Sequence, residues 1–506
     1  MLAKALSVSL FGLAGRIIEV ETDISSNLPA FVLVGLPDAS INEAAARVRA
    51  AATNSKLPLP GRRITVNLSP ASVPKQGSSF DLSIAVSVLA ASGYFASSHV
   101  EGTVFFGELA LDGRIKPVLG VLAAVVAAKQ LGISKVVIPA ANLGEVHRIS
   151  GVTVVGYDHL TQLVADLGVE VPVIAAEPRS FEAEIAKNEI GCFSEVVGQE
   201  DAVSAMKLAA VGGHHVLMVG PPGAGKTMLA SRLPGILPRL SEDQAIEVGA
   251  IRSLSKQNPF EYSELPPIQS PHHTASLASM VGGGSAQPKP GLISLAHRGV
   301  LFLDEAPEFQ SPVLEALRQP LESGQITISR ASGQAVFPAK FQLVLAANPC
   351  PCGFAVGSGK DCTCSSSSRM RYLAKISGPL SDRIDLRIQL NPVNAALVTA
   401  QHPSAGERSS DLQLQVTQAR AASSERLKGT PWSLNSEVAG SYLRRELRLS
   451  KSITKQLDYA LDQRLISMRG YDRCLKLAWS IADLTGRNTP NLEDISLAAF
   501  YRGSEL

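Results

Sequence analysis

The sequence predicts a multidomain α/β chain, and three changes of pattern along the chain predict its organisation. Over residues 1–170, short β-branched runs alternate with alanine-rich helical runs, which is typical of an α+β domain with its own core. Over residues 193–391, apolar strands alternate with glycine-rich loops and helices, as in a parallel α/β core. Residues 392–506 have helical patterns and almost no strand pattern. Residues 171–192 lose periodicity and gain charge and proline, so we expect a linker there.

Length and composition agree with a large globular chain. At about 150 residues per domain, the 506 residues suggest about three domains. Hydrophobic residues make up 45% of the chain and charged residues 18%, which is enough apolar surface for large cores. The net charge of +2 neither requires nor excludes a polyanionic partner, so any nucleic-acid surface has to be a local patch. No apolar run reaches the roughly 18 residues that span a bilayer, so we expect a cytoplasmic protein with no membrane partner.

Several segments define the expected elements at the two ends of the chain. RRITVNLSP and SKVVIPAAN predict strands, whereas SINEAAARVRAAATNS and LGVLAAVVAAKQLG predict helices. The first residues, MLAKALSVSLFGLAG, have the apolar content of a signal peptide. Alternation continues through RIIEVETDI, however, so we predict a pair of strands. Near the other end, SKSITKQLDYALDQRL, YDRCLKLAWSIADLTG and NLEDISLAAFYR predict helices.

The strongest motif is a phosphate-binding loop between a strand and a helix. The apolar run Val216–Val219 leads into a segment that fits G-x-x-x-x-G-K-[ST], and a helical pattern follows. Glycines let backbone N–H groups curl around a phosphate, and the helix dipole favours negative charge there. We expect Lys226 to reach the β- and γ-phosphates of ATP and the Thr227 hydroxyl to bind Mg²⁺. The nucleotide-binding segment comprises Gly220, Pro221, Pro222, Gly223, Ala224, Gly225, Lys226 and Thr227.

A second motif places two acids at the end of a buried strand. The run Gly299–Leu303 is apolar and ends in Asp304 and Glu305. An aspartate at this position holds Mg²⁺ in P-loop ATPases, and Glu305 is the natural base to orient the attacking water. Two solvated acids capping a strand are the alternative, but both motifs occur in the expected order.

Together these motifs resemble the AAA+ superfamily of ATPases, which implies three further site residues. The apolar strand in FQLVLAANP ends at Asn348, the position of the sensor 1 residue that helps to place the attacking water. Arg383 follows a short helical segment, where AAA+ rings have an arginine that reaches the γ-phosphate of the neighbouring subunit. An internal salt bridge from Arg383 to Asp382 or Asp385 is the alternative. Arg469 begins a C-terminal helix in the position of sensor 2, and Arg473, one turn later, competes for that role.

Longer phrases resemble the ComM/YifB family of bacterial magnesium-chelatase-like AAA+ proteins, over nearly the whole chain. These phrases are PHHTASLASMVGGG, ISLAHRGVLFLDE, LEALRQPLESGQITISRASGQAVFPAKFQLVLAANPCPCG and ISGPLSDRID. The resemblance implies a Lon-protease-like (S5-type) domain at 1–170, a chelatase-type AAA+ core at 193–391 and a helical lid at 392–506. Members related to ComM are known as hexameric DNA helicases that drive branch migration during natural transformation. The implied partners are therefore single-stranded and branched DNA, bound with low sequence specificity, and further copies of the chain in a homohexameric ring.

Four cysteines follow the sensor segment with the spacing C-x-C-x9-C-x-C. Cys350, Cys352, Cys362 and Cys364 form two close pairs, which suits a tetrahedral, structural Zn²⁺. Reduced thiols that merely lie near each other and a redox disulfide are the alternatives. The other two cysteines, Cys192 and Cys474, lie in apolar segments and are interpreted as packing residues.

Candidates for DNA contact are less well defined. QITISRASGQAVFPAKFQLV predicts a hairpin with a tight turn at 331–333, and Arg330 and Lys340 on it could touch phosphates. A solvated hairpin is the equal alternative. The basic segment 366–371, SSSRMR, is a second candidate. His272 and His273 are interpreted as neutral packing residues, with a place beside the nucleotide or a metal as the alternative.

Three other functions remain open at this point. A magnesium-chelatase motor subunit would use the same ATPase machinery. A Lon-type protease would need a base beside Ser79, which lies where the Lon nucleophile would be, but Leu122 stands at the position of the partner lysine, and Lys116 and Lys129 are offset. A non-enzymatic assembly factor would leave the two acids after Leu303 idle.

Overall fold

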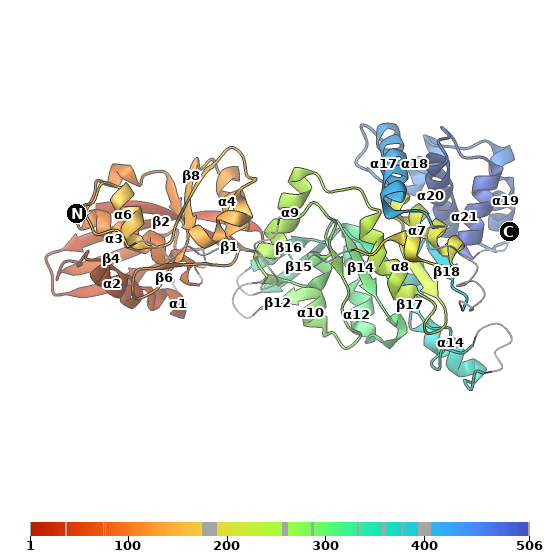
Figure 1. Cartoon of the computed structure of the whole chain (residues 1–506), viewed down its shortest axis with the longest axis horizontal. Helices are drawn as coiled ribbons and strands as arrows, with labels where there is room; N and C mark the ends of the chain where they lie inside the picture. The colour runs from red at the N-terminus through yellow and green to blue at the C-terminus, as the bar shows by residue number, and fades with distance from the viewer. Residues whose placement is uncertain are drawn as a thin grey trace.

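A computed structural model describes most of the chain: residues 2–35, 38–73, 75, 77–174, 190–255, 262–284, 288–330, 333–355, 361–376, 378–392 and 406–503. Three folded regions follow one another along its long axis, from an N-terminal sheet through a central sheet to a C-terminal group of helices (Figure 1). Most of the predicted linker, residues 175–189, lies outside the described residues. None of the helices in the described part is long and apolar enough to cross a membrane.

The N-terminal region is built on a seven-stranded sheet with the order β3-β4-β2-β1-β5-β8-β9. The predicted strand pair is confirmed, because β1 and β2 pair antiparallel from Leu2 opposite Asp23 to Phe11 opposite Ala14. Alternate residues of β4 are buried, as its alternating sequence requires. The strands are β1 Leu2–Phe11, β2 Ala14–Ser25, β3 Ala30–Val34, β4 Arg63–Ser69, β5 Thr103–Phe105, β8 Lys135–Pro139 and β9 Thr153–Tyr157, with a small pair β6 Glu108–Leu109 and β7 Ile115–Lys116.

Helices cover this sheet and supply much of its core. Every residue of α3 is buried, which its run of alanine, valine and leucine allows. The predicted helices at 40–55 and 119–132 are observed as α1 with α2 and as α4. The bounds are α1 Ala39–Asn42, α2 Ala44–Asn54, α3 Asp81–Ala91, α4 Val121–Gln130, α5 Leu143–Val146 and α6 Leu160–Asp166.

The central region is a parallel sheet with the order β11-β14-β17-β10-β18. Its inner strands are buried on both faces, which is why they are continuous apolar runs in the sequence. The strands are β10 Val216–Val219, β11 Ile268–Gln269, β14 Val300–Leu303, β17 Gln342–Ala347 and β18 Leu386–Gln389, with the short pair β12 Gly282–Gly283 and β13 Lys289–Pro290 and the hairpin β15 Gln325–Arg330 and β16 Gly333–Pro338. The helices are α7 Glu200–Gly212, α8 Lys226–Arg232, α9 Glu242–Ser253, α10 Leu277–Val281, α11 Leu292–Leu295, α12 Ser311–Ala316 and α13 Arg318–Ser323.

After β18 the described residues contain helices and no strand, as the sequence predicts. Helices α17, α20 and α21 pack against the central region through α7 and β18. The helices on either side of β18 are α14 Ser366–Ala374, α15 Gly378–Ser381, α17 Ser409–Arg426, α18 Gly440–Arg445, α19 Lys451–Asp462, α20 Met468–Leu484 and α21 Leu492–Arg502.

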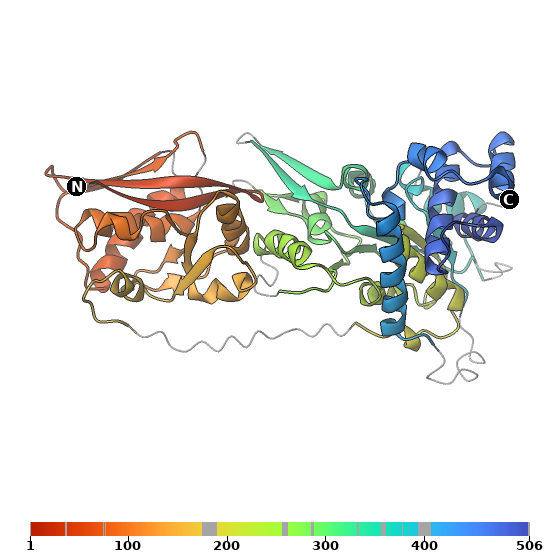
Figure 2. The same cartoon turned by 90° about the horizontal axis from the view of Figure 1, so that it is seen from above.

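The N-terminal and central regions are in contact at two places. Helix α4 packs on α9, and the Gly120 N–H donates to the Ser253 carbonyl at 2.7 Å. The turn between β1 and β2 reaches the β15–β16 hairpin, where a Cβ on Gly12 would lie 3.2 Å from the Ala335 Cβ. Figures 1 and 2 both show this turn beside the hairpin. The two regions are therefore joined by packing as well as by the chain.

Candidate nucleotide and metal sites

The phosphate loop occupies the carboxyl end of β10, where the sequence predicts it. Gly223 and Gly225 have φ angles of 77° and 88°, a conformation that a glycine adopts without strain. Gly225 caps α8, so the loop leads directly into the helix N-terminus at Lys226. This arrangement aims backbone N–H groups and the positive end of the helix dipole at one point, which suits a phosphate.

Lys226 lies buried at the centre of this loop. Its Nζ donates to the carbonyls of Gly220 at 2.6 Å and Pro221 at 2.9 Å, and to Asn348 Oδ1 at 3.0 Å. Burial lowers the pKa of Lys226, and the charges of Asp304 and Glu305 oppose that shift. The structure therefore brings together the loop lysine and the sensor asparagine, which are 122 positions apart in the sequence.

Thr227 and Asp304 meet at the same edge of the sheet. The Thr227 hydroxyl donates to Asp304 Oδ2 at 2.7 Å, and Asp304 Oδ1 accepts the Glu305 N–H at 2.9 Å. A hydroxyl and a carboxylate oxygen are hard donors that Mg²⁺ prefers. The donor set therefore fits Mg²⁺ held between the loop and the end of β14.

Glu305 is exposed and has a left-handed backbone with φ 51°, which is uncommon for a residue other than glycine. Its Oε2 lies 3.5 Å from His273 Nδ1, and the rings of His272 and His273 are 4.1 Å apart. The interpretation of these histidines as packing residues is wrong: His272 is exposed, and His273 approaches the predicted base. The PHHT segment thus belongs to the site, because the chain after β11 passes the end of β14.

Gln199 is a buried polar residue of the site that the sequence interpretation missed. Its Nε2 donates to the Asn391 carbonyl at 2.7 Å and to the carbonyl of Ala224 in the phosphate loop at 3.4 Å. A glutamine directly before the first residue of α7 was the available signal. It ties the phosphate loop to the segment that follows β18.

Arg383 is half-buried between α15 and β18, and its guanidinium donates to Glu322 of α13. Of the two expected internal partners, Asp382 lies beside Arg469 and Asp385 accepts from Arg473. Burial lowers the pKa of Arg383, and nearby Arg469, Arg473 and Arg318 add to the shift. Arg383 thus lies among other arginines and pairs with an exposed acid of α13.

The two candidates for the lid arginine have different environments. Arg469 is exposed, with NH1 3.6 Å from Asp382 Oδ2. Arg473 instead donates to the buried carboxylate of Asp385 and, at 3.0 Å, to the Arg383 carbonyl. Burial alone would raise the pKa of Asp385, but the charges of Arg473 and His214 lower it overall. Arg473 is therefore committed to joining α20 to β18, and Arg469 is the arginine that faces solvent.

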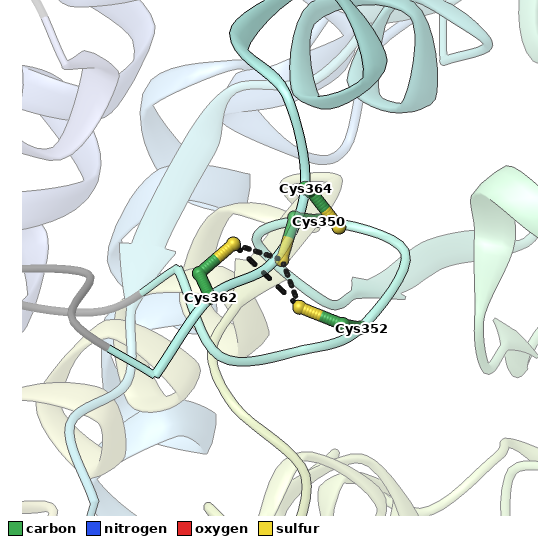
Figure 3. A group of neighbouring side chains, drawn as sticks. All are labelled: Cys350, Cys352, Cys362 and Cys364. Carbon is green, nitrogen blue, oxygen red and sulfur yellow. Dashed lines mark hydrogen bonds between the residues drawn. The ribbon is translucent and has the colours of Figure 1, made fainter.

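The four cysteines converge on one point, as Figure 3 shows. Cys350 Sγ lies 3.3 Å from Cys352 Sγ, each of them lies 3.6 Å from Cys362 Sγ, and all four sulfur atoms lie within 4.8 Å of one another. Around a tetrahedral Zn²⁺ with bonds of about 2.3 Å, sulfur atoms lie about 3.8 Å apart. The Phe354 N–H lowers the pKa of Cys352 to about 6, which favours the thiolate that a metal binds. The donor set fits Zn²⁺.

The remaining cysteines differ from each other. Cys474 is buried, as a packing residue should be. Cys192 is half-buried, and its Sγ accepts the Ser409 N–H at 3.3 Å. Burial opposes the shift, but hydrogen bonds from Ser194 and Ser409 lower the pKa of Cys192 to about 7. The packing interpretation is wrong for Cys192, since it has a polar environment.

The predicted DNA-contact residues are partly engaged within the chain. Arg330 Nε donates to the Gly284 carbonyl at 3.2 Å, whereas Lys340 is exposed at the base of the hairpin. The hairpin is confirmed, although residues 331–332 of its predicted turn lie outside the described residues. In the segment 366–371, Arg369 Nε donates to the Cys364 carbonyl at 3.2 Å and Arg371 Nε to the Ser367 carbonyl at 3.4 Å.

Two lysines of the N-terminal region, Lys75 and Lys116, have other partners. Lys75 is fully buried, and its Nζ donates to the backbone carbonyls of Gly35 and Pro70. Lys116 Nζ lies 3.7 Å from Glu108. Leu122, at the position of the Lon lysine, is buried in α4 and packs toward Gly249 of α9. This position serves the contact with the central region and not proton transfer.

Three separate parts of the chain match families that are named for magnesium chelatase. Residues 192–398 match the family described as magnesium chelatase, subunit ChlI. Residues 20–142 match subunit ChlI of Mg-chelatase, and residues 406–502 match the magnesium chelatase subunit ChlI C-terminal family.

Individual relatives match over nearly their whole length. The chain is 46% identical to an uncharacterised protein of Mycobacterium tuberculosis over 505 residues, 99% of this chain and 98% of that protein. It is 39% identical to the competence protein ComM of Haemophilus influenzae over 99% of this chain and 97% of ComM. It is 38% identical to the uncharacterised protein YifB of Escherichia coli over 96% of this chain and 94% of YifB. A partial similarity to Lon protease 2 of Bacillus subtilis, 29% over 147 residues, covers 28% of this chain.

Proposed function

Because the chain belongs to the ComM/YifB family of magnesium-chelatase-like AAA+ proteins, we propose that it is a ring-forming, Mg²⁺-dependent ATPase that moves DNA strands. The observation that carries the ATPase part is the meeting of four side chains at one edge of the central sheet. Lys226 contacts Asn348 there, and Thr227 contacts Asp304. These groups come from three parallel strands, and such an edge is where ligands of open α/β sheets bind.

Each residue has a distinct role in this proposal. Lys226 exchanges its carbonyl partners for the β- and γ-phosphates of ATP, and Asn348 keeps the ammonium group and the attacking water in place. Glu305 accepts a hydrogen bond from that water and orients it. Thr227 and Asp304 would hold Mg²⁺, which would supply positive charge beside the phosphates. Arg383 of a neighbouring copy and Arg469 of the lid supply further positive charge.

The choice of DNA as substrate rests on the family. The Haemophilus influenzae relative is named a competence protein, and the resemblance to that family implies branch migration in recombination. We therefore propose single-stranded and branched DNA as partners, a homohexameric ring as the working state and the cytoplasm as the location.

We also propose that Cys350, Cys352, Cys362 and Cys364 hold a structural Zn²⁺. The supporting observation is the convergence of their sulfur atoms within 4.8 Å. Four thiolates around Zn²⁺ leave no open coordination position, so this metal would fix the loop and take no part in hydrolysis.

The decisive experiment is ATP-dependent migration of a synthetic four-way junction, measured together with ATP hydrolysis. We expect the wild-type protein to convert the junction into two duplexes by branch migration. We also expect junction DNA to increase its rate of ATP hydrolysis. Glu305→Gln should still bind ATP but hydrolyse it at least about 100-fold more slowly, since a positioned base contributes about 10²–10⁴-fold. ATP turnover that no DNA stimulates, with no migration, would contradict the DNA part and leave the ATPase part standing.

A chelatase-type motor is the second candidate, because all three matched families are named for magnesium chelatase. It predicts ATPase stimulation by the porphyrin-binding partner subunits and none by DNA. Parallel assays with junction DNA and with those subunits separate the two functions.

A further inference from the structure

A dense group of cations lies where α18 meets α19, in a segment that the proposed function does not use. Residues 444–455 contain five basic side chains and one carboxylate, a net charge of +4 in a chain whose net charge is +2. Arg444 is paired with Asp472. The other four are exposed, and within the described part of the chain they form no ion pair; we call them the lid cations: Arg445, Arg448, Lys451 and Lys455.

The position of these charges works against the stability of α19. The helix begins at Lys451 and has no acidic residue in its first turn, although the helix dipole disfavours cations there. The Ser450 hydroxyl does not cap the helix and instead lies 2.8 Å from Ser452 Oγ. Helices α9 and α21 of the same protein start with a capping box and two acids each. The cations of α19 therefore need an explanation other than helix stability, and an anionic ligand supplies one.

An exposed aromatic side chain continues the same helix face. Three residues of α19 follow one another at intervals of four: Lys451, Lys455 and Tyr459. They therefore lie along one side of the helix, and each is about 6 Å further along the helix axis than the one before. Tyr459 is 63% exposed. Tyr471, by contrast, is buried in the lid and donates its hydroxyl to Asp458 Oδ1 at 2.8 Å. Tyr459 thus offers a free ring face at the end of a row of cations.

We propose that the row formed by Lys451, Lys455 and Tyr459 on α19, with Arg445 and Arg448 in the segment just before it, binds single-stranded DNA without sequence preference; we call this the lid face. Cations contact backbone phosphates, and an exposed aromatic ring stacks on a base, which together are the two means by which proteins hold single strands. The exposed acid Glu446 lies between Arg445 and Arg448, and the exposed Asp462 follows Tyr459, so we expect the site to hold only a few nucleotides. The choice of DNA among polyanions rests on the proposed function. The face lies on the outer C-terminal helices (Figure 1), on a different region from the β15–β16 hairpin.

The test is the affinity of the full-length protein for a fluorescein-labelled oligothymidylate, measured by anisotropy over a series of salt concentrations. Lys451→Gln/Lys455→Gln should raise the Kd at least about 10-fold. It should also reduce the slope of log K against log salt by about 1.4, because each phosphate contact to a single strand contributes about 0.7. Tyr459→Ala should weaken binding about 5-fold or more through lost stacking, and Tyr459→Phe should restore it.

The matched control is Lys428→Gln, which removes an exposed lysine of the lid that pairs with Glu425. It should leave the Kd unchanged, and all four variants should keep the wild-type ATPase rate measured without DNA. Unchanged Kd values for the lysine and tyrosine variants, with wild-type binding intact, would overturn this site and leave the proposed function standing. Weakened binding of poly-glutamate, with oligothymidylate binding unaffected, would assign the face to an acidic protein and also overturn it. A wild-type protein that binds no oligothymidylate would overturn both.

Discussion

At the residue scale, Glu145 shows how a buried carboxyl links pH to stability. Asn142 Nδ2 donates to Glu145 Oε1 at 2.6 Å and to the Val118 carbonyl at 3.1 Å, so the pair holds the segment that leads into α4. The other carboxyl oxygen, Oε2, is buried, and no group in the described part of the chain donates a hydrogen bond to it. Burial raises the pKa of Glu145 from 4.5 to about 7, against the hydrogen bonds from Asn142 and Leu122. The folded protein therefore prefers the protonated acid.

The first residue-scale prediction concerns Glu145→Gln. Between about pH 4.5 and 7 the folded state binds more protons at this site than the unfolded state, so wild-type stability should fall as pH rises. Glutamine keeps the carbonyl that accepts from Asn142 and has no charge to desolvate. We expect the variant to gain up to about 3 kcal/mol above pH 7 and little at pH 4.5.

Urea denaturation at pH 5 and pH 8 measures this difference. The exposed Glu101→Gln serves as the control and should leave the unfolding midpoint unchanged at both values. An equal loss of stability for Glu145→Gln at pH 5 and pH 8 would show that burial of the charged carboxylate does not destabilise the folded protein.

At the scale of single elements, the cysteine turn is packed directly on the phosphate loop. The chain runs from Asn348 into Cys350, and Gly353 closes the turn with φ 82°. A Cβ on Gly353 would lie 2.7 Å from Pro222 Cδ. The turn that would hold Zn²⁺ therefore packs against the loop that would hold ATP. A change in the conformation of the turn should alter the conformation of the loop.

We predict that Cys352→Ser lowers the zinc content and weakens ATP binding. Gly353→Ala should retain zinc but weaken ATP binding about 5-fold or more, because it adds backbone strain and a clash with Pro222. Binding of a fluorescent ATP analogue and metal analysis of the purified proteins measure the two effects separately.

Gly429→Ala is the control for backbone strain alone. Gly429 has nearly the same φ, 83°, and a Cβ there would meet open space. If Gly429→Ala and Gly353→Ala reduced ATP affinity equally, contact with Pro222 would not be the cause.

At the scale of the whole molecule, we propose that the ATPase site is completed by Arg383 of a neighbouring copy. Arg383 is held by Glu322 of its own α13, whereas Lys226 and Asp304 lie at the edge formed by β10 and β14. Assembly would have to exchange the contact with Glu322 for one with a phosphate. Glu322 is exposed and Arg383 is half-buried, so the exchange would replace one negatively charged partner of the guanidinium by another and would not leave it unpaired.

We predict that Arg383→Ala binds ATP but loses about 10³-fold or more in turnover, which is the contribution of an arginine supplied in trans. Mixing it with Lys226→Ala should recover part of the activity, because some mixed interfaces contain one intact loop and one intact arginine. Steady-state ATPase of the mixture measures this. Glu322→Gln removes the carboxylate of this ion pair and should keep activity near wild type. Absence of any recovery in the mixture would place Arg383 in the site of its own chain or outside it.

Sequence patterns predicted the site best where its residues are close together in the chain. The phosphate loop, the acids after β14 and the four cysteines each occupy one short segment, and their chemistry depends on spacing within that segment. The strands and helices expected around them were also observed. Gln199, His273 and the partner of Arg383 were missed or misinterpreted, because their contacts join segments 25 to 192 positions apart.

The sequence by itself determined the order of the three regions and the family, and it predicted the residues that would bind phosphate and metal, because periodicity and short motifs are properties of neighbouring residues. Only the tertiary structure decided which of those residues meet. Parallel strands from distant segments end at a common edge, and this brings Lys226 to Asn348 and Thr227 to Asp304. The same packing commits Arg473 to Asp385 and leaves Arg469 in solvent, a difference that two arginines one helical turn apart do not reveal in sequence.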